Sequence, residues 1–217
     1  MRTTDAAQRL SERARTALEA LQGKTFNYDL ELAADVGPAS GWNVDDYCQP
    51  LPSEEPGSPA PDGPFEAAVE LATNYEFADP RIVRAVYDPN APLENRDMLL
   101  EVRFYGLRFL FGCRVGGLVD AIRDVQGRRV RVWGWNYRTL QGHLEMGQMD
   151  YEVWKWLDNG DVEFRIHVLS RAARIPNPVI RLGFRLFGRR VQTKFARRAC
   201  ERMAKLTAEH VSGQVGD

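Results

Sequence analysis

The second half of the chain alternates hydrophobic and polar residues, a pattern that is typical of half-buried strands. The alternation is strictest from Val162 to Val168, where every second side chain is apolar. Such a strand places its apolar residues on one face and Glu163, Arg165 and His167 on the other. The pattern as a whole predicts five consecutive strands, at residues 98–106, 107–124, 128–140, 149–158 and 161–171.

Glycine-containing segments separate these strands and predict how they connect. Asn159-Gly160 lies between two alternating runs and is a strong signal for a hairpin. The segment from Gly142 to Gly147 connects two further strands. Three glycines fall inside a strand pattern, where they predict bulges or a sharp bend: Gly112, Gly116 and Gly117. We therefore expect a curved antiparallel sheet.

The first part of the chain gives weaker signals. Residues 5–22 carry Ala and Leu at helical spacing, and Gly23 follows as a helix stop. The density of proline between residues 46 and 64 predicts a loop or a lid over the surface. The segment 65–77 fits either a strand or a helix, whereas Asp79-Pro80 is the start signal of a helix.

The tail has the pattern of a long amphipathic helix. From Ile180 to Leu206, apolar residues recur every three or four positions and form one stripe. Strands followed by such a helix predict an α+β fold, in which a curved antiparallel sheet of six or seven strands wraps around a long C-terminal helix. The chain then divides into an N-terminal helix (1–24), an acidic Pro-rich loop or lid (25–64) and a sheet-and-helix domain (65–217).

Composition places the chain among ordinary globular proteins, with 44% hydrophobic and 27% charged residues. No run reaches the roughly 18 apolar residues of a membrane span. The N-terminus lacks the apolar core of a secretory signal, so we expect a cytoplasmic location. Three cysteines and three histidines are scattered without metal-ligand spacing. We therefore expect no disulfide, no metal site and no cofactor.

The net charge of −1 conceals two oppositely charged regions. Residues 25–80 hold twelve Asp and Glu and no Lys or Arg, whereas residues 171–205 hold eleven Lys and Arg and a single Glu. The acidic part can pack near the basic helix, or both can be solvated surfaces. The basic helix can also attract an anionic membrane surface. Nucleic acid is not an expected partner because no docking motif is present, and the sequence leaves the oligomeric state open.

His143 and Glu145 are the candidate catalytic pair. If their segment is extended, both side chains point to the same face. A histidine two residues from a carboxylate can act as a general acid or base near neutral pH. Alternatively, both side chains satisfy backbone groups of the connection. Gly142 and Gly147 on either side favour that structural role, because they indicate a constrained backbone.

A second set of residues is a candidate lining for an apolar cavity. The aromatic members stand at alternate strand positions, where they form core or pocket wall. An arginine and a histidine of the last strand line the cavity only if their face turns inward. A further arginine, where the last strand meets the tail helix, can bind an anionic head group. These candidates are Trp135, Tyr137, Trp156, Arg165, His167 and Arg174.

One stretch carries a resemblance to a known family: Tyr137-x-Thr139-Leu140-x-Gly142-His143-x-Glu145-x-Gly147, followed by an aromatic strand, Ser170-Arg171 and an Arg-rich closing helix. From about Asn74 to that helix, the chain resembles DUF1990, a family of unknown function. The order of strands and helix is also similar to the helix-grip architecture of the START and polyketide-cyclase superfamily. The resemblance implies that residues 65–217 form a helix-grip-like domain, but a fold does not fix a function.

Three functions are compatible with these observations. The first is the binding of a hydrophobic or amphipathic small molecule in a cavity between the sheet and the C-terminal helix. The alternative is a metal-independent cyclase, dehydratase or lyase that uses His143 and Glu145 in the same cavity. The third is a peripheral protein that binds anionic membranes or another partner through the basic helix. Whether the protein is an enzyme depends on whether His143 and Glu145 reach the cavity.

Overall fold

A computed structural model describes residues 12–29, 37–104, 107–174 and 178–214. The strands in these ranges are β1 (Asn43–Leu51), β2 (Val83–Val86), β3 (Asp97–Phe104), β4 (Leu107–Val125), β5 (Arg128–Thr139), β6 (Glu145–Trp156) and β7 (Val162–Ala172). The helices are α1 (Glu12–Glu19), the 3-10 helix η2 (Pro38–Ser40), α2 (Pro64–Thr73) and α3 (Pro178–Gln214). All strands belong to one antiparallel sheet, in the order β1-β7-β6-β5-β4-β3-β2.

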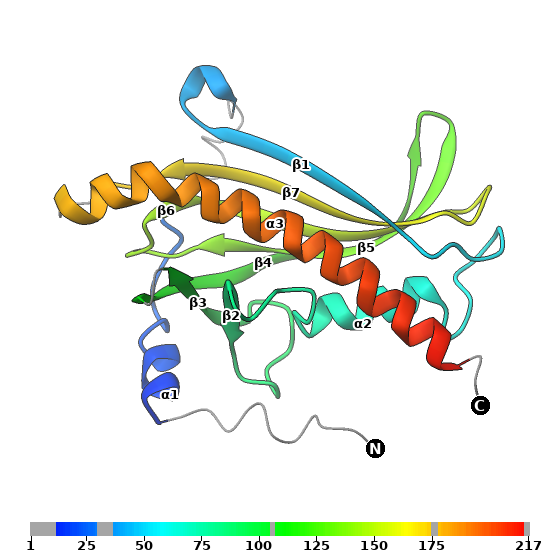
Figure 1. The fold of residues 1–217 in the computed structure, drawn as a ribbon, viewed down its shortest axis with the longest axis horizontal. Coiled ribbons are helices and arrows are strands. Elements are labelled where there is room, and N and C mark those ends of the chain that lie inside the picture. The colour runs from blue at the N-terminus through cyan, green and yellow to red at the C-terminus, as the bar shows by residue number, and fades with distance from the viewer. Residues whose placement is uncertain (1–11, 30–36, 105–106, 175–177, 215–217) are drawn as a thin grey trace.

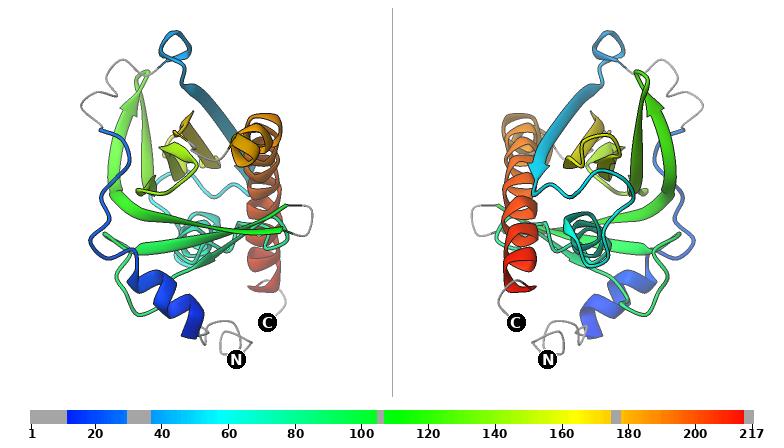
Figure 2. Two further views of the ribbon diagram at one scale, coloured as in Figure 1. Left: turned by 90° about the vertical axis from the view of Figure 1, so that its left-hand side faces the viewer. Right: turned by 90° about the vertical axis from the view of Figure 1, so that its right-hand side faces the viewer.

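The sheet curves around the two longer helices (Figures 1 and 2). Helix α3 runs along the open side of the curve beside β1 and β7, and its C-terminal half packs against α2. The concave face of the sheet therefore encloses α2 and faces α3, while the convex face points outward. This arrangement is a helix-grip, and it confirms the predicted α+β fold with a seven-stranded curved sheet and a long C-terminal helix.

The predicted β6–β7 hairpin and a bulge at Gly116 are confirmed, whereas Gly112 pairs in regular register with Leu99. Gly160 closes the β6–β7 hairpin with a φ of +78°, a left-handed conformation that glycine adopts without strain. The β4–β5 ladder shifts register between Val115 and Gly117, so Gly116 is the extra residue of a bulge. Bulges bend a strand and increase its twist, which lets the long β4 follow the curvature of the sheet.

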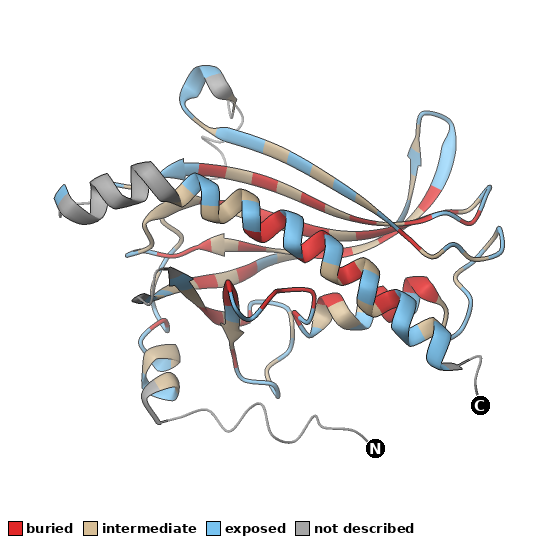
Figure 3. Ribbon diagram, viewed as in Figure 1, coloured by how far each residue is buried: buried red, intermediate tan, exposed pale blue. Residues whose placement is uncertain are grey.

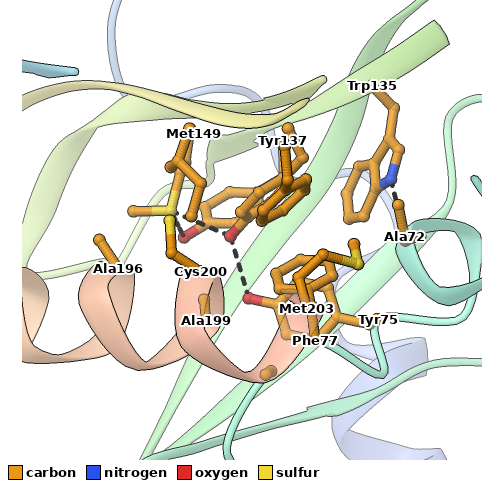
Figure 4. Close-up of a cluster of buried hydrophobic side chains, with 14 of the residues drawn as sticks. Ala72, Tyr75, Phe77, Trp135, Tyr137, Met149, Ala196, Ala199, Cys200 and Met203 are labelled. Atoms are coloured by element: carbon orange, nitrogen blue, oxygen red, sulfur yellow. Dashed lines mark hydrogen bonds between the residues drawn. The ribbon is translucent and has the colours of Figure 1, made fainter. Parts of the chain in front are cut away.

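The core fills the space between the concave face, α2 and the C-terminal half of α3 (Figures 3 and 4). From the predicted helical stripe, Phe195, Ala199 and Met203 are buried there. The stripe positions from 180 to 187 lie outside the described side chains. Tyr75 and Phe77, which follow α2, pack against Tyr151 with ring centroids 5.8 and 4.6 Å away. This half of the grip is therefore closed by aromatic packing.

The predicted loop over residues 46–64 is wrong in its first part. Residues 43–51 form the edge strand β1, whose register places Asn43 opposite Ser170 and Leu51 opposite Val162. Pro50 lies within this strand, and proline is tolerated at a sheet edge because one side of the strand makes no ladder bonds. The division of the chain at residues 24 and 64 stays a prediction.

The rest of the Pro-rich segment is anchored by a buried ion pair. The side chains of Glu54 and Lys155 are 2% and 0% exposed and are paired with each other. Lys155 also donates to the Ser58 carbonyl at 3.0 Å. Glu54 accepts the backbone N–H groups of Ala60 at 3.0 Å and Phe65 at 2.7 Å. One carboxylate thus joins the segment to β6 and to the first turn of α2.

Two other expectations are resolved by the structure. The segment 65–77 is helical over Pro64–Thr73, as α2, and its Ala positions face the core. The helix predicted from Asp79-Pro80 is wrong, because the chain makes one turn there and enters strand β2. Asp79 accepts the backbone N–H of Arg81 at 3.0 Å, so the helix-start signal is used in a turn. The β-branched residues that follow pair with β3.

The N-terminal helix is confirmed over the part that the structure describes. Helix α1 spans Glu12–Glu19, whereas the predicted positions 5–11 lie outside the described residues. Gly23 has a φ of +80°, as expected of a residue that ends a helix. Leu21 packs with Leu99 of β3 and with Leu140, the residue that follows β5. Within the described ranges, neither α3 nor any other helix has the length and apolar character required to cross a membrane.

Candidate functional site

Two strands and a helix place ionisable side chains on the concave face, at the end of the grip opposite α2. Met149, Tyr151 and Val153 of β6 are buried in the core, so Glu145 lies on the same face by the two-residue period of a strand. Tyr137 of β5 and Arg189 of α3 interact electrostatically with the Glu145 carboxylate. We call Phe111, Tyr137, His143, Glu145 and Arg189 the Glu145 site.

His143 lies in the connection between β5 and β6 and is fixed on two sides. Its Nδ1 accepts the backbone N–H of Glu145 at 2.9 Å. Its ring packs against Phe111 with the centroids 4.8 Å apart. Burial lowers the pKa of His143 to about 4, so the imidazole is neutral at pH 7. Because Nδ1 is an acceptor, the neutral ring carries its proton on Nε2 and can donate it in a hydrogen bond.

The pKa of the Glu145 carboxyl group is raised, whereas that of His143 is lowered. Burial raises the pKa of Glu145 to about 7, although the positive charge of Arg189 acts in the other direction. The residue as a whole remains partly exposed. At neutral pH a carboxyl group with this pKa is present in both protonation states. It can therefore donate or accept a proton without a large energetic penalty.

Arg189 connects the site to the edge of the sheet. Its guanidinium binds the Asp45 carboxylate through two nitrogens and donates to Gln192 Oε1 at 3.0 Å. The hydroxyl of Ser170 donates to the same Gln192 oxygen at 3.3 Å. These contacts join α3 to β1 and β7 beside Glu145. We call Asp45, Ser170, Arg189 and Gln192 the edge latch.

The inner wall next to the site consists of tyrosine hydroxyls and a thioether (Figure 4). Tyr75 and Tyr151 share a hydrogen bond of 3.2 Å, and Tyr151 donates to Met149 Sδ at 2.9 Å. Tyr137 lies 3.7 Å from the same sulfur and is 8% exposed. Burial raises the pKa of all three phenols above the ordinary value of 10. They are therefore neutral, and Tyr137 is the predicted ligand-binding aromatic that lies nearest to Glu145.

Trp135 has a structural role in the core. It is 2% exposed, and its indole N–H donates to the Ala72 carbonyl at the end of α2, at 3.1 Å. This bond satisfies one of the carbonyls that a helix end leaves unpaired. Trp135 thus belongs to the packed half of the grip, and it is separated from Glu145 by the tyrosine cluster.

Three other predicted ligand-binding residues lie on the convex face, and the expectation that they line a cavity under α3 is wrong. The inward positions of β7 are Phe164, Ile166 and Val168, so the alternate positions point outward. There Arg165 lies over the Trp154 ring at 3.8 Å. On the same face, the Trp156 ring contacts the Arg128 guanidinium and its indole N–H donates to Glu163. His167 forms a hydrogen bond with Asp46.

Arg174 lines a groove outside the grip. The groove has a volume of about 970 Å³ and lies between residues 25–29 and the β5–β6 connection. Its aromatic side is Phe26 and Tyr28, over which the guanidinium of Arg138 lies at 3.8 and 5.0 Å. His143 borders both this groove and Phe111. Of the predicted site residues, the structure therefore brings together Tyr137, His143 and Glu145.

Sequence reasoning missed Phe111 and Arg189 in the Glu145 site, and Asp45 in the edge latch. Phe111 lies on the concave face of β4, next to Gly112, and the pattern there predicted only a bulge or bend. Arg189 was one of many arginines in the tail, and no local pattern distinguishes it. Among the described residues there is no group of three His, Cys, Asp or Glu side chains arranged to hold a metal ion.

Comparison with solved structures gives matches of low sequence identity. The protein TTHA0849 from Thermus thermophilus is 6% identical, covers 77% of this chain and 97% of its own, and has a TM-score of 0.45. A START superfamily protein from Mycobacterium smegmatis is 8% identical, with 76% and 97% covered and a TM-score of 0.43. Human STARD10 is 9% identical, with 97% and 88% covered and a TM-score of 0.34. None of the curated proteins matches the chain.

A family model gives a match of much greater weight. The model described as "Domain of unknown function (DUF1990)" matches residues 27–202. The match starts earlier than the resemblance read from the sequence, which began near Asn74, and so it includes β1. It also contains His143, Glu145, Arg189 and the whole sheet. The chain therefore belongs to the DUF1990 family.

Proposed function

We propose that the protein binds an amphipathic small molecule at the Glu145 site. In this proposal the apolar part of the ligand lies against Phe111, Tyr137 and Met149, beside the N-terminal part of α3. Its polar group meets Glu145 and the Nε2–H of His143. Apolar walls with a few converging polar groups are the usual composition of a small-molecule site.

The observation that carries the proposal is the position of Glu145, which is partly exposed and lies on the same face as the buried Tyr137 and Met149. An ionisable side chain that has a raised pKa and belongs to a partly exposed residue in an apolar wall is a good candidate for a functional group. The alternative position for a ligand, beside the C-terminal half of α3, is already filled by Phe195, Met203 and the rings of Tyr75 and Phe77. This packing supports a position for the ligand on the Glu145 side.

The test is native mass spectrometry of freshly purified protein, followed by identification of any small molecule that denaturation releases. We expect a stoichiometric amphipathic passenger, and weaker retention of it in the Glu145→Gln and Tyr137→Phe variants. His167→Asn is the matched control because His167 is polar, partly exposed and on the convex face. Equal retention by all three variants would place the passenger elsewhere. A protein that remains free of ligand after incubation with a lipid extract would contradict the proposal.

A second candidate function is proton transfer to the bound molecule, and the pKa of Glu145 near 7 favours it. The roles of the predicted pair then differ from a simple acid–base couple. Glu145 moves the proton, whereas His143 is a poor base because its pKa is about 4 and its Nδ1 is occupied. A neutral imidazole N–H can instead polarise a carbonyl oxygen of the substrate. A dehydratase, lyase or cyclase step that starts by removing a proton next to a carbonyl fits these groups.

This second function has its own experiment. The passenger identified by mass spectrometry is incubated with the protein in D₂O, and incorporation of deuterium next to its carbonyl group is followed by NMR. If the protein transfers a proton, deuterium is incorporated by the wild type. Glu145→Gln should abolish this exchange, whereas Tyr137→Phe should not, because it leaves the carboxyl group in place. Stoichiometric binding without any exchange would leave the protein a carrier.

A further inference from the structure

The outer surface of α3 carries an exposed row of cations. Arg190, Lys194, Arg197 and Arg198 are all exposed and recur at spacings of three and four, so they share one side of the helix. A shallow groove of about 410 Å³ runs between these side chains. We call these four residues the basic row. Glu201 is the acidic residue in the same groove, and it pairs with Arg198 at 2.8 Å.

Most of the basic row has no carboxylate partner in the part of the chain that the structure describes. Within the described residues, no ion pair joins Arg190, Lys194 or Arg197 to a carboxylate. The acidic strand β1 neutralises Arg189 instead, through Asp45 in the edge latch. Among the described residues, the acidic first part of the chain pairs with Arg189 and makes no ion pair with the basic row.

The opposite side of the same stretch of helix is buried in the core. Phe195, Ala196, Ala199 and Met203 are at most 4% exposed and pack into the grip. From residue 188 onward, where its side chains are described, helix α3 therefore offers no large exposed apolar side chain for insertion into a bilayer. Any attraction of this surface for a partner is electrostatic, and it must decrease steeply with salt.

We infer that the basic row docks the protein on anionic lipid bilayers by electrostatic adsorption. The charge complementarity is direct, because juxtamembrane Lys and Arg residues are attracted to anionic headgroups. Single-stranded nucleic acid is the less suitable polyanion, because its binding uses aromatic side chains as stacking platforms. The one aromatic residue of α3 among the described side chains, Phe195, points into the core. This inference is independent of whether the Glu145 site binds a ligand.

The test is flotation of the purified full chain with vesicles at low ionic strength. One set of vesicles contains phosphatidylcholine alone, and the other contains about 30% phosphatidylserine. We expect binding to the second set only, and its loss at 0.5 M salt, where the Debye length is roughly 4 Å. Each cation near an anionic membrane surface strengthens partitioning by about fivefold. The triple variant Arg190→Gln, Lys194→Gln, Arg197→Gln should therefore bind about a hundredfold more weakly.

The control is a triple variant with the same change in net charge on other elements: Arg81→Gln, Arg108→Gln, Arg129→Gln, all at exposed positions. It should retain nearly all of the binding. Circular dichroism verifies that both variants fold, which is expected because every substituted side chain is exposed. Three results would overturn the inference. They are a wild-type protein that does not bind anionic vesicles, an equal loss of vesicle binding in the two triple variants, and tighter binding to a single-stranded oligonucleotide than to the vesicles.

Discussion

The ion pair between Glu54 and Lys155 provides the most direct test of how the Pro-rich segment is held. Both side chains are almost completely removed from solvent, with exposures of 2% and 0%. Removing one partner of such a pair leaves an uncompensated buried charge, which costs about 3–5 kcal/mol. Since a domain of this size is stabilised by about 5–15 kcal/mol in total, either single variant should lose a large part of its stability.

We propose a double-mutant cycle with Glu54→Gln, Lys155→Met and the double variant. Each single variant should lower the free energy of unfolding by about 3–5 kcal/mol, equivalent to a decrease in Tm of roughly 6–20 °C. The double variant should lose less stability than the sum of the two single losses, because it buries no unpaired charge. Glutamine also keeps an oxygen that can accept the N–H of Phe65.

The assay is urea unfolding at pH 7, followed by tryptophan fluorescence and circular dichroism. The exposed pair Arg198–Glu201, with side-chain exposures of 55% and 59%, is the control, and its removal by Arg198→Gln should change stability by less than about 1 kcal/mol. Losses in the Glu54 and Lys155 variants that match this control would refute the reasoning. So would additive effects, because they would show that the two charges do not depend on each other.

Three further predictions concern the carboxyl group, the convex face and the β6–β7 turn. The folded-state pKa of Glu145 near 7 lies above the ordinary 4.5, so the folded protein binds the proton more tightly, and stability should fall by at most about 3 kcal/mol as pH rises from 4.5 to 7. Glu145→Gln should remove this slope in urea titrations, and an unchanged slope would contradict the assignment. Arg165→Ala should uncover Trp154, red-shift its fluorescence and cost about 1–2 kcal/mol; an unshifted spectrum would mean that the ring stays covered. Gly160→Ala should destabilise by more than about 1 kcal/mol in thermal unfolding, because φ is +78° and a Cβ would meet the Glu54 carbonyl oxygen; a Tm equal to that of the wild type would argue against this turn.

The strands that could be predicted, β3 to β7, show a clear alternation of apolar and polar residues. From β3 to β7, each strand pairs with the next, and the alternation of side chains reflects one buried face. β1 could not be predicted in this way, because it has a solvated face, contains Pro50 and pairs with a strand more than a hundred residues away. At Asp79-Pro80 a helix-start signal was overridden by the pairing of β2 with β3.

The site was predictable only in part, for the same reason. The motif around His143 and Glu145 lies at the connection from β5 to β6, and strand alternation placed Trp135 and Tyr137 together on the face of β5 that turns inward. That Glu145 shares this face with Tyr137 was not predicted. Which face of β7 turns inward depends on the curvature of the sheet, so the sequence left open whether Arg165 and His167 line the cavity, and the structure places them on the outer face. Burial sets the pKa values of His143 and Glu145, and the segments that bury them are distant in sequence.

The pairing of β1 with β7 has a consequence for biosynthesis. Asn43 and the Ser170 carbonyl that it contacts are 127 residues apart, and a ribosome that adds about 5–20 residues per second needs roughly 6–25 s to produce the second after the first. During this interval the edge strand has no partner. Its Asp45, Asp46 and Pro50 are residues that oppose pairing with a strand of another chain. The acidic and proline residues that prevented the prediction of this strand thus also oppose its aggregation while it is still unpaired.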